Sequence, residues 1–379
     1  MSGSSGGGLA RYDGPDLFRP LSIFGVVLIH FPRVLELGSD PVVGVMFRLR
    51  DCALPIIILT SFFVITRSQL ANPSRTFVQF ASKRFVRLGV PCAVWSALYW
   101  LVWEVAGPLW RGQPASWPPP SLLLSGYAHL WFLQFLLFGS VIAYPVVKAM
   151  APSTRAWDRA AGIWAAACVA AALAYWMWGR PVLTARAASA LGEHADVHLQ
   201  VAVRQAITYA KYPILGVAAA LMAGTIEELH RRPAFRAASV LVAAAACLVH
   251  VAALAPTVSR VFYSMAVFVA LLRPWPAGAL DRLRPVARLS YPIYVIHPVV
   301  ARVVYIAFNG WLAPPSIPGL VAGSLAVFAL SGAAAALLRT LAPVEWLLPI
   351  VPVKQARAGA GNGASPRAPD RSAGRRGSS

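Results

Sequence analysis

Long apolar stretches separated by short polar segments follow one another along almost the whole chain. Each stretch has about the length, ~20 residues, that a helix needs to cross the hydrocarbon layer of a membrane. The strands of a transmembrane barrel would instead show ~10-residue segments of alternating polarity. The pattern predicts an all-α, polytopic membrane bundle of about ten transmembrane helices, at residues 16–35, 51–67, 87–106, 126–147, 160–178, 207–225, 236–254, 257–272, 288–308 and 318–340.

The two ends of the chain differ from this apolar region. Residues 1–12 are rich in Gly and Ser and predict a flexible lead, so the first span itself is expected to direct insertion. Residues 351–379 are rich in Gly, Ala, Ser, Pro and Arg, a composition that cannot bury a core. We expect a disordered basic tail there, and a single transmembrane domain over residues 13–350.

Composition and charge agree with a membrane protein. The chain is 58% hydrophobic and 13% charged, whereas soluble domains carry about a quarter charged residues. The net charge of +20 comes from short basic clusters between the spans and not from an aromatic-interleaved basic face, which argues against a nucleic-acid partner. With both termini in the cytoplasm, 24 of the 34 Lys and Arg residues lie on the inner side, as the positive-inside rule requires.

Two other features carry little chemistry. The four cysteines lie in or beside apolar segments without a CxxC pair, so we interpret them as small core residues. The segment 179–206 is the longest expected outer loop and holds His194, Asp196 and His198. Their spacing fits neither one helical face nor a zinc pattern, so we expect a solvated loop and no metal site.

The first span contains Arg19 and His30, and ionisable residues inside a membrane indicate function by default. Arg19 and His30 are eleven residues apart, which on a helix is ~16 Å and only ~20° beyond three full turns. They would therefore share one face. Simpler explanations are that Arg19 anchors the span at the cytoplasmic boundary and that His30 bonds a neighbouring helix. Pro20 directly follows Arg19, so the helix can begin or bend there.

An arginine pair opens the third span on the expected cytoplasmic side. Arg84 and Arg87, in "SKRFVRLGVP", have the spacing of neighbours on a helix surface. Two guanidinium groups so placed can grip a phosphate bidentately. Anchoring by the positive-inside rule explains the same pair without a ligand.

Polar aromatic motifs occur near the outer boundary and in the ninth span. "YAHLWFL" contains His129 and Trp131, which also suit an interfacial aromatic belt. "LSYPIYVIHPVV" places Tyr291, Tyr294 and His297 on one helical face, before a proline that can kink the helix. Each of these side chains also suits a hydrogen-bonded core.

Taken together, these motifs resemble the acyltransferase-3 family of integral membrane acyltransferases, which modify bacterial surface glycans. The resemblance covers about residues 13–340 and rests on the order of "DLFRPLSIFGVVLIH", "ALPIIILTSFFVITRS", "SKRFVRLGVP", "HLWFL" and "LSYPIYVIHP". One departure is Phe62, which stands where the family usually has glycine and is expected to alter close packing of the second span.

The resemblance implies an O-acyltransferase of the bacterial cytoplasmic membrane without a bound cofactor. Its donor would be a cytoplasmic acyl-CoA, commonly acetyl-CoA, whose phosphates would meet Arg84 and Arg87, with help from Arg19. His30 would act as general base or as covalent acyl carrier, because a neutral imidazole suits both roles. His129, Trp131, Tyr294 and His297 would orient the acceptor or stabilise the oxyanion.

The acceptor implied by the family is a hydroxyl of a glycan or a lipid-linked saccharide at the outer side, as in exopolysaccharide, capsule or lipopolysaccharide O-acetylation. The sequence leaves the acceptor and the acyl chain length open. Two other functions are consistent with a polytopic bundle that buries charge, namely a transporter or flippase of a lipid-linked glycan and a non-catalytic partner in glycan export. The basic tail could also contact anionic lipid of the inner leaflet.

Overall fold

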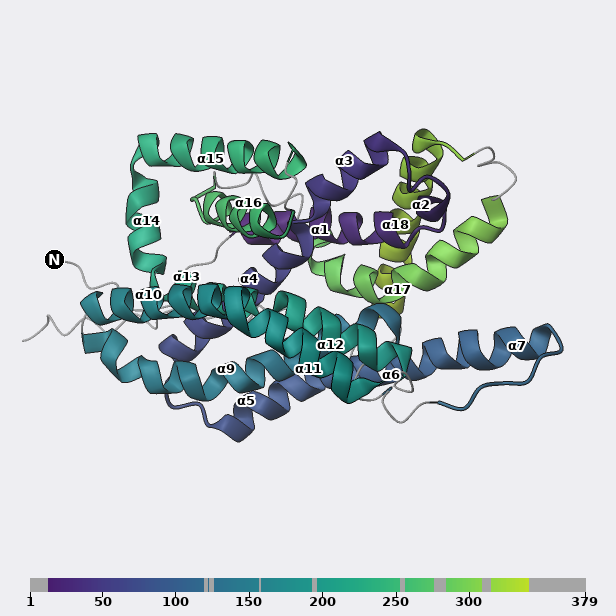
Figure 1. Ribbon diagram of the computed structural model, residues 1–379, viewed down its shortest axis with the longest axis horizontal. Coiled ribbons are helices and arrows are strands. Elements are labelled where there is room, and N and C mark those ends of the chain that lie inside the picture. Colours follow the sequence, from purple (N-terminus) through teal and green to yellow (C-terminus); the bar gives the residue numbers. More distant parts are fainter. Residues whose placement is uncertain are drawn as a thin grey trace, which may run out of the picture.

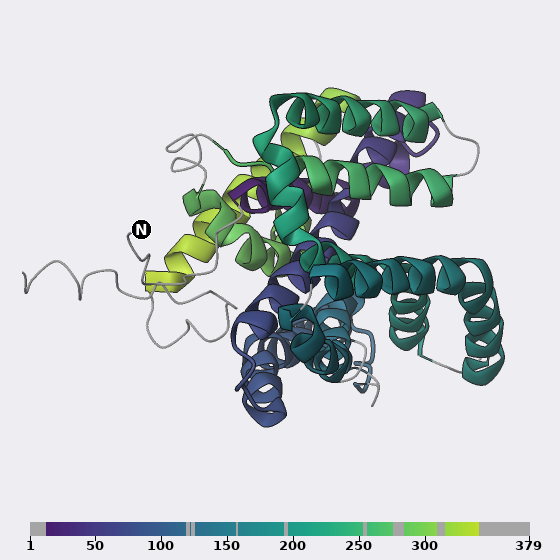
Figure 2. The ribbon, with the colours of Figure 1, turned by 90° about the vertical axis from the view of Figure 1, so that its left-hand side faces the viewer.

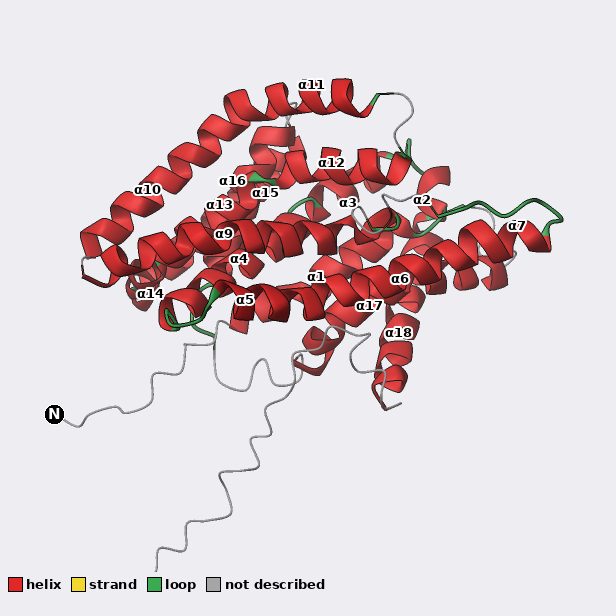
Figure 3. Ribbon diagram, turned by 90° about the horizontal axis from the view of Figure 1, so that it is seen from below, coloured by secondary structure: helices red, strands yellow, loops and turns green. Residues whose placement is uncertain are grey.

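The structure is a computed structural model and describes residues 13–118, 122, 126–156, 158–192, 196–252, 256–275, 284–308 and 315–340. These residues form helices and connecting turns without a strand (Figure 3), which confirms the all-α prediction. The expected lead at 1–12 and the expected tail at 351–379 lie outside the described residues.

The first half of the described chain contains two short helices beside longer ones. Its α-helices are α1 (Asp13–His30), α2 (Arg33–Glu36), α3 (Pro41–Arg50), α4 (Ala53–Ala71), α5 (Phe77–Arg84), α6 (Val90–Trp100), α7 (Gly107–Trp110) and α9 (Trp131–Ala156). A 3-10 turn, η3 (Ala128–Leu130), precedes α9, and the π-helical segments η1 (Phe85–Gly89) and η2 (Leu101–Ala106) flank α6.

The second half continues in the same way. Its α-helices are α10 (Asp158–Ala174), α11 (Arg180–Leu191), α12 (Val197–Tyr209), α13 (Lys211–Leu221), α14 (Ala223–Arg231), α15 (Pro233–Ala252), α16 (Pro256–Leu271), α17 (Arg284–Phe308) and α18 (Ile317–Thr340). The π-helical segment η4 (Tyr175–Gly179) joins α10 to α11.

Every predicted span overlaps one of these helical segments. Fewer of the segments, however, are long and apolar enough to cross a membrane. Within the described residues, six helices are long and apolar enough to cross a membrane, or seven if a bent pair counts as one span. The predicted count of ten and the cytoplasmic placement of both termini therefore remain predictions. The coarser conclusion, a helical multi-pass membrane protein, is supported.

Two local expectations were wrong. The segment expected as an outer loop, 179–206, is largely helical, since α11 and α12 occupy most of it. The span expected at 207–225 is not straight, because the helix from Val197 to Leu221 and the helix from Ala223 to Arg231 meet at 63°. Figure 1 shows α14 crossing between α13 and α15 at this bend.

Helix α1 lies at the centre of the packing that positions the site. It packs against α17, α4 and α18, while α4 packs along its length against α13. Helices α15 and α16, drawn in green in Figure 2, form an antiparallel pair that packs on α4 through α16 and on α3 through α15. The shared core is almost wholly apolar and includes the fully buried side chains of Val27, Phe31, Phe62, Phe63 and Leu133.

Phe62 on α4 occupies a space that two glycines leave open. A Cβ atom on Gly216 of α13 would lie 2.8 Å from the Leu59 carbonyl oxygen and 2.9 Å from Phe62 Cβ. A Cβ atom on Gly139 of α9 would lie 2.9 Å from Phe62 Cζ. The large side chain at position 62 is therefore accommodated by small residues on both facing helices.

We expect Gly216→Ala to lower the free energy of unfolding by about 1–3 kcal/mol, because the added methyl group meets the backbone of α4. Thermal unfolding of the purified protein in detergent measures this as a lower Tm. Gly224→Ala is the matched control, since no heavy atom lies within 4 Å of a Cβ at that helical position. Equal Tm values for the two variants would contradict the close packing of α4 on α13.

Candidate active site

Three histidines from distant parts of the chain meet where α1 ends. His30 is the last residue of α1, His129 lies in η3, and His297 lies in α17. Their ring centroids are 5.1 Å apart for His30 and His297, 5.2 Å for His129 and His297, and 5.8 Å for His30 and His129. The fold thus brings together all three histidines that the sequence motifs single out.

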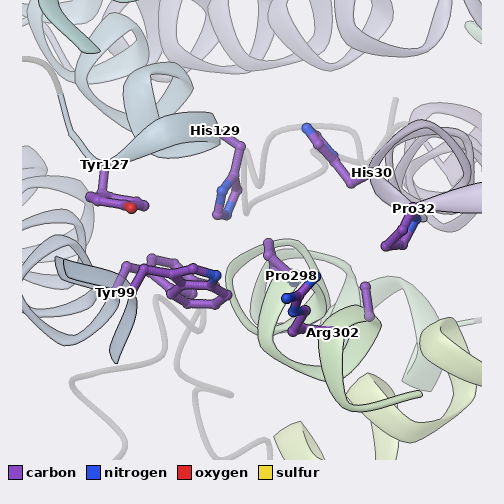
Figure 4. A pocket seen from close by; sticks show the side chains of 9 residues that line it. His30, Pro32, Tyr99, Tyr127, His129, Pro298 and Arg302 are labelled. Carbon is purple, nitrogen blue, oxygen red and sulfur yellow. The ribbon is translucent and has the colours of Figure 1, made fainter. Parts of the chain in front are cut away.

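Two of these histidines, His30 and His129, border a cavity of about 280 Å³, and His297 lies behind its wall. Figure 4 shows His30 and His129 directed toward the same open space from opposite elements. The His30 side chain is exposed to the cavity, whereas His129 and His297 are buried. The other lining residues are Pro32, Tyr99, Trp103, Tyr127, Pro298, Ala301 and Arg302.

The orientation of His297 follows from the proline after it. Helix α17 runs on through Pro298, but proline has no N–H, so the carbonyl of Tyr294 four residues earlier loses its helical donor. His297 Nδ1 lies 2.7 Å from that oxygen and takes the place of the missing N–H. A carbonyl oxygen can only accept, so Nδ1 of His297 carries the proton and Nε2 presents a lone pair.

The same argument assigns the proton on His30. His30 Nδ1 lies 3.0 Å from the Val26 carbonyl oxygen and 3.1 Å from His297 Nε2. Both partners accept, so the Nδ1–H of His30 is shared between them. The lone pair of a neutral His30 is then on Nε2, the nitrogen that these bonds leave free. This is the arrangement that a general base or an acyl carrier requires.

Two buried tyrosines fix the walls of the cavity through backbone bonds. The Tyr294 hydroxyl donates to the His129 carbonyl oxygen, and the Tyr99 hydroxyl donates to the Val295 carbonyl oxygen. The rings of Tyr99 and Tyr294 also meet His129 edge to face, each with centroids 5.3 Å apart. These contacts tie η3 and α6 to α17.

Tyr127 closes the cavity on the side of η3. Its hydroxyl donates to Glu104 Oε1 at 2.9 Å, and its ring lies 4.6 Å from that of His198 on α12. A carboxylate accepts, so the Tyr127 phenol keeps its proton in this bond, and its ring lines the cavity.

A family comparison agrees with these motifs. A model of the acyltransferase domain of the acyltransferase-3 family matches residues 12–336, which is most of the chain. The chain belongs to the acyltransferase-3 family. No curated protein and no solved structure gave a match to the sequence. Membership of this family implies that the protein is a membrane acyltransferase, as the sequence motifs predicted.

Two predicted site residues of this acyltransferase lie away from the cavity. Arg19 is half-buried near the start of α1, ~16 Å along the helix from His30, and α1 continues through Pro20. Trp131 stacks on Tyr209 with centroids 5.8 Å apart and borders a different, apolar cavity. Neither side chain lines the histidine cavity.

The arginine pair has a different backbone from the one expected. Arg84 ends α5, but Arg87 lies in the π-helical segment η1, which precedes Pro91. The backbone between the two arginines is therefore not the regular α-helix expected, because a π-helical turn holds more residues, and their shared role remains a prediction. The two guanidinium groups still act on each other electrostatically, and Arg75 adds a third charge. Arg84 also lies 5.4 Å above the Phe80 ring.

Four cavity residues were missed by the sequence motifs, namely Tyr99, Trp103, Tyr127 and Arg302. Arg302 follows His297 by five residues inside an apolar span, and a charge in such a span is itself a signal. Tyr99 and Trp103 are four residues apart, the spacing of neighbours on one helical face. Among the described residues no group of His, Cys, Asp and Glu side chains could hold a metal ion.

We expect neutral His30 and His297 of the acyltransferase both to carry the proton on Nδ1. Solid-state NMR of ¹⁵N-histidine-labelled protein in lipid measures this through the distinct shifts of protonated and bare ring nitrogens. Spectra of His30→Ala and His297→Ala assign the signals by subtraction. Protonated Nε2 on His30 would contradict the arrangement, since Val26 could then not accept from the ring.

Proposed function

We propose that this membrane acyltransferase moves an acyl group, commonly acetyl in its family, from cytoplasmic acyl-CoA to a hydroxyl of a glycan or lipid-linked saccharide at the outer side. We place it in the cytoplasmic membrane of a bacterium, where it would act in surface-polysaccharide O-acetylation. The proposal rests on the cavity into which His30 exposes a basic nitrogen. The rings of His297 and His129 lie next to His30.

The donor is proposed to bind at the opposite end of the third helical segment. Coenzyme A carries several phosphate charges, and Arg84, Arg87 and Arg75 form a cationic group that suits them. Residue 84 precedes Tyr99, which lines the histidine cavity, by roughly 20 Å along α5, η1 and α6. An extended acyl carrier held at the arginines is thus needed to bring its thioester to His30.

The proposed chemistry requires one base and one leaving group. His30 Nε2 takes the proton of the acceptor hydroxyl while the oxygen attacks the thioester carbonyl. The tetrahedral intermediate then expels the thiolate of coenzyme A as the C–S bond breaks, and the thiolate takes up the proton. If His30 is instead acylated at Nε2, the thiolate leaves in that first step; the hydroxyl then attacks the acyl-imidazole carbonyl, the C–N bond breaks to return Nε2 its lone pair, and the hydroxyl proton passes to the thiolate. Both routes use the same free nitrogen.

The rest of the cavity supplies the other requirements of the reaction. Arg302 is the cation that lines it, and a cation beside the reacting carbonyl stabilises the developing oxyanion. His129 Nε2 is buried without a hydrogen-bond partner among the described residues, so a small rotation of this ring would be needed to bring Nε2 to the acceptor. Tyr99, Trp103 and Tyr127 provide aromatic faces, against which a sugar ring packs well.

The first test separates chemistry from donor binding. We expect His30→Ala to bind acetyl-CoA like wild type but to lose roughly 10²–10⁴-fold in acyl transfer, because the base or acyl carrier is gone. Purified protein in nanodiscs with radiolabelled acetyl-CoA, or longer acyl-CoAs, gives both measurements. A transporter, the alternative function, would show no acyl-CoA-dependent chemistry in the wild type, and a non-catalytic export partner would likewise leave the donor intact.

In the same assay Arg84→Ala/Arg87→Ala should weaken donor binding by more than tenfold, since each lost charge-assisted bond weakens it severalfold. Arg231→Ala is the control, because Arg231 is a largely exposed cation of α14. Unchanged donor binding in the double variant would move the donor site elsewhere.

Arg302→Gln should lower kcat by roughly 10²-fold with a small change in KM, as expected for a group that acts on the oxyanion and not on the bound substrate. Steady-state kinetics of acyl transfer measures the two constants separately. Arg302→Lys, which keeps the charge, should recover part of kcat. A change confined to KM would assign Arg302 to acceptor binding instead.

A further inference from the structure

A second polar cluster lies where α4 begins and where α15 and α16 meet. Arg260 Nη2 donates to Asp51 Oδ2 at 2.8 Å, and His250 Nε2 lies 3.4 Å from the same oxygen. Ser259 Oγ lies 2.8 Å from His250 Nδ1. The Arg260 side chain is 27% exposed and the Asp51 side chain 16% exposed, so an incoming group can reach the cluster.

Cations outnumber anions at this place. Arg50 and Lys211 each interact electrostatically with Arg260, Lys211 also interacts with Arg180, and the carboxylate of Asp51 interacts with Arg50 and Arg260. Lys211 is 3% exposed and donates to the Thr208 carbonyl oxygen at 2.8 Å. The Nε atoms of Arg50 and Arg260 are buried without a hydrogen-bond partner among the described residues. Asp51 compensates only part of this positive charge, and the remaining excess suits an added anion.

The cluster adjoins the histidine cavity. The Arg50 side chain packs against α1 at Gly25, where a Cβ atom would lie 3.2 Å from Arg50 Cβ, five residues before His30. The positive charge of Arg50 also acts electrostatically on His30. Since five residues of a helix rise about 8 Å, an anion bound at Arg50 would lie about that far along α1 from His30, near the proposed reaction centre but not in contact with it.

An apolar cavity of about 600 Å³ begins at the same place. It follows α9 from Trp131 to Val147, about 24 Å at 1.5 Å per residue. Ala210 and Pro213 also line it, on both sides of the buried Lys211. Trp131, which lines one end of this cavity, stacks on Tyr209, and the Tyr209 side chain interacts with that of Arg260. A ligand with a charged head and a long hydrocarbon tail matches this continuity.

We propose that Arg50, Arg260 and Lys211 bind the phosphate of a membrane lipid whose hydrocarbon tail occupies the apolar cavity that begins at Trp131. This inference rests on the proposed function and narrows its acceptor: the hydroxyl presented to His30 belongs to a phosphate-bearing lipid. The phosphate compensates the excess positive charge, and the apolar cavity holds the tail within the membrane.

Binding to the full-length protein in detergent tests this without any acyl donor. The probes are dioleoyl phosphatidic acid, dioleoylglycerol without phosphate, and glycerol phosphate without tails, each measured by native mass spectrometry. We expect phosphatidic acid to bind at least tenfold more tightly than either of the others. Equal binding of dioleoylglycerol would overturn the phosphate site, and equal binding of glycerol phosphate would reduce it to a site for free phosphate.

Charge removal supplies the second arm. Lys211→Met and Arg260→Gln should each weaken phosphatidic acid binding about tenfold, whereas Arg111→Gln, which removes an exposed loop cation, should not. Lys211→Met leaves Asp51 paired with Arg260, so it remains informative if Arg260→Gln fails to fold. Unchanged binding in Lys211→Met and in a folded Arg260→Gln would overturn the inference.

The outcome is separable from that of the proposed function. His30→Ala should retain lipid binding while it loses acyl transfer. Acyl-CoA turnover without lipid binding would contradict only the phosphate-lipid site. Lipid binding without any acyl-CoA turnover in the wild type would contradict the acyltransferase chemistry and leave the binding site standing.

Discussion

The candidate site depends on one hydrogen bond, from His297 Nδ1 to the Tyr294 carbonyl oxygen. Pro298 removes the N–H that would normally bond this carbonyl, and leaving it unpaired in the core would cost about 1–3 kcal/mol. The imidazole that replaces the N–H is held in one orientation and one tautomer, and it passes that constraint to His30 at 3.1 Å. The missing backbone hydrogen bond in α17 thus fixes the position of His30, the last residue of α1.

Packing around α4 keeps α1 and α17 in register. The Phe62 ring fills the space beside Gly139 and Gly216, so α4 cannot move toward α9 or α13 without a clash. Helix α1 packs on both α4 and α17, and the 3.1 Å contact between the histidines tolerates little sliding of α1. The apolar core that excludes water is therefore also what sets the distance between polar groups from helices far apart in sequence.

The sequence predicted the site best where a residue type costs much free energy inside a membrane. His30, His129 and His297 stand out from apolar surroundings, and the structure joins them. Periodicity located the helices but not the bend after Leu221 or the helical character of 179–206, because polar helices outside the apolar runs give no hydropathy signal. It also missed Tyr99 and Trp103, since aromatic residues at helical spacing are equally typical of a core. The π-helical backbone at Arg87 depends on Pro91 and on neighbouring side chains. A rule based on α-helical spacing takes neither into account.

The arrangement of charge suggests why the base lies between two cationic groups and not within either. An anion bound next to His30 would favour its protonated form, which cannot accept a proton from a hydroxyl. Arg84 and Arg87 are separated from the cavity by the length of α6, and Arg260 is paired with Asp51, which lies between α3 and α4. Phosphate groups drawn to these places stay apart from the Nε2 atom of His30, while the reacting carbonyl, which is uncharged until it is attacked, can approach that atom and Arg302 together.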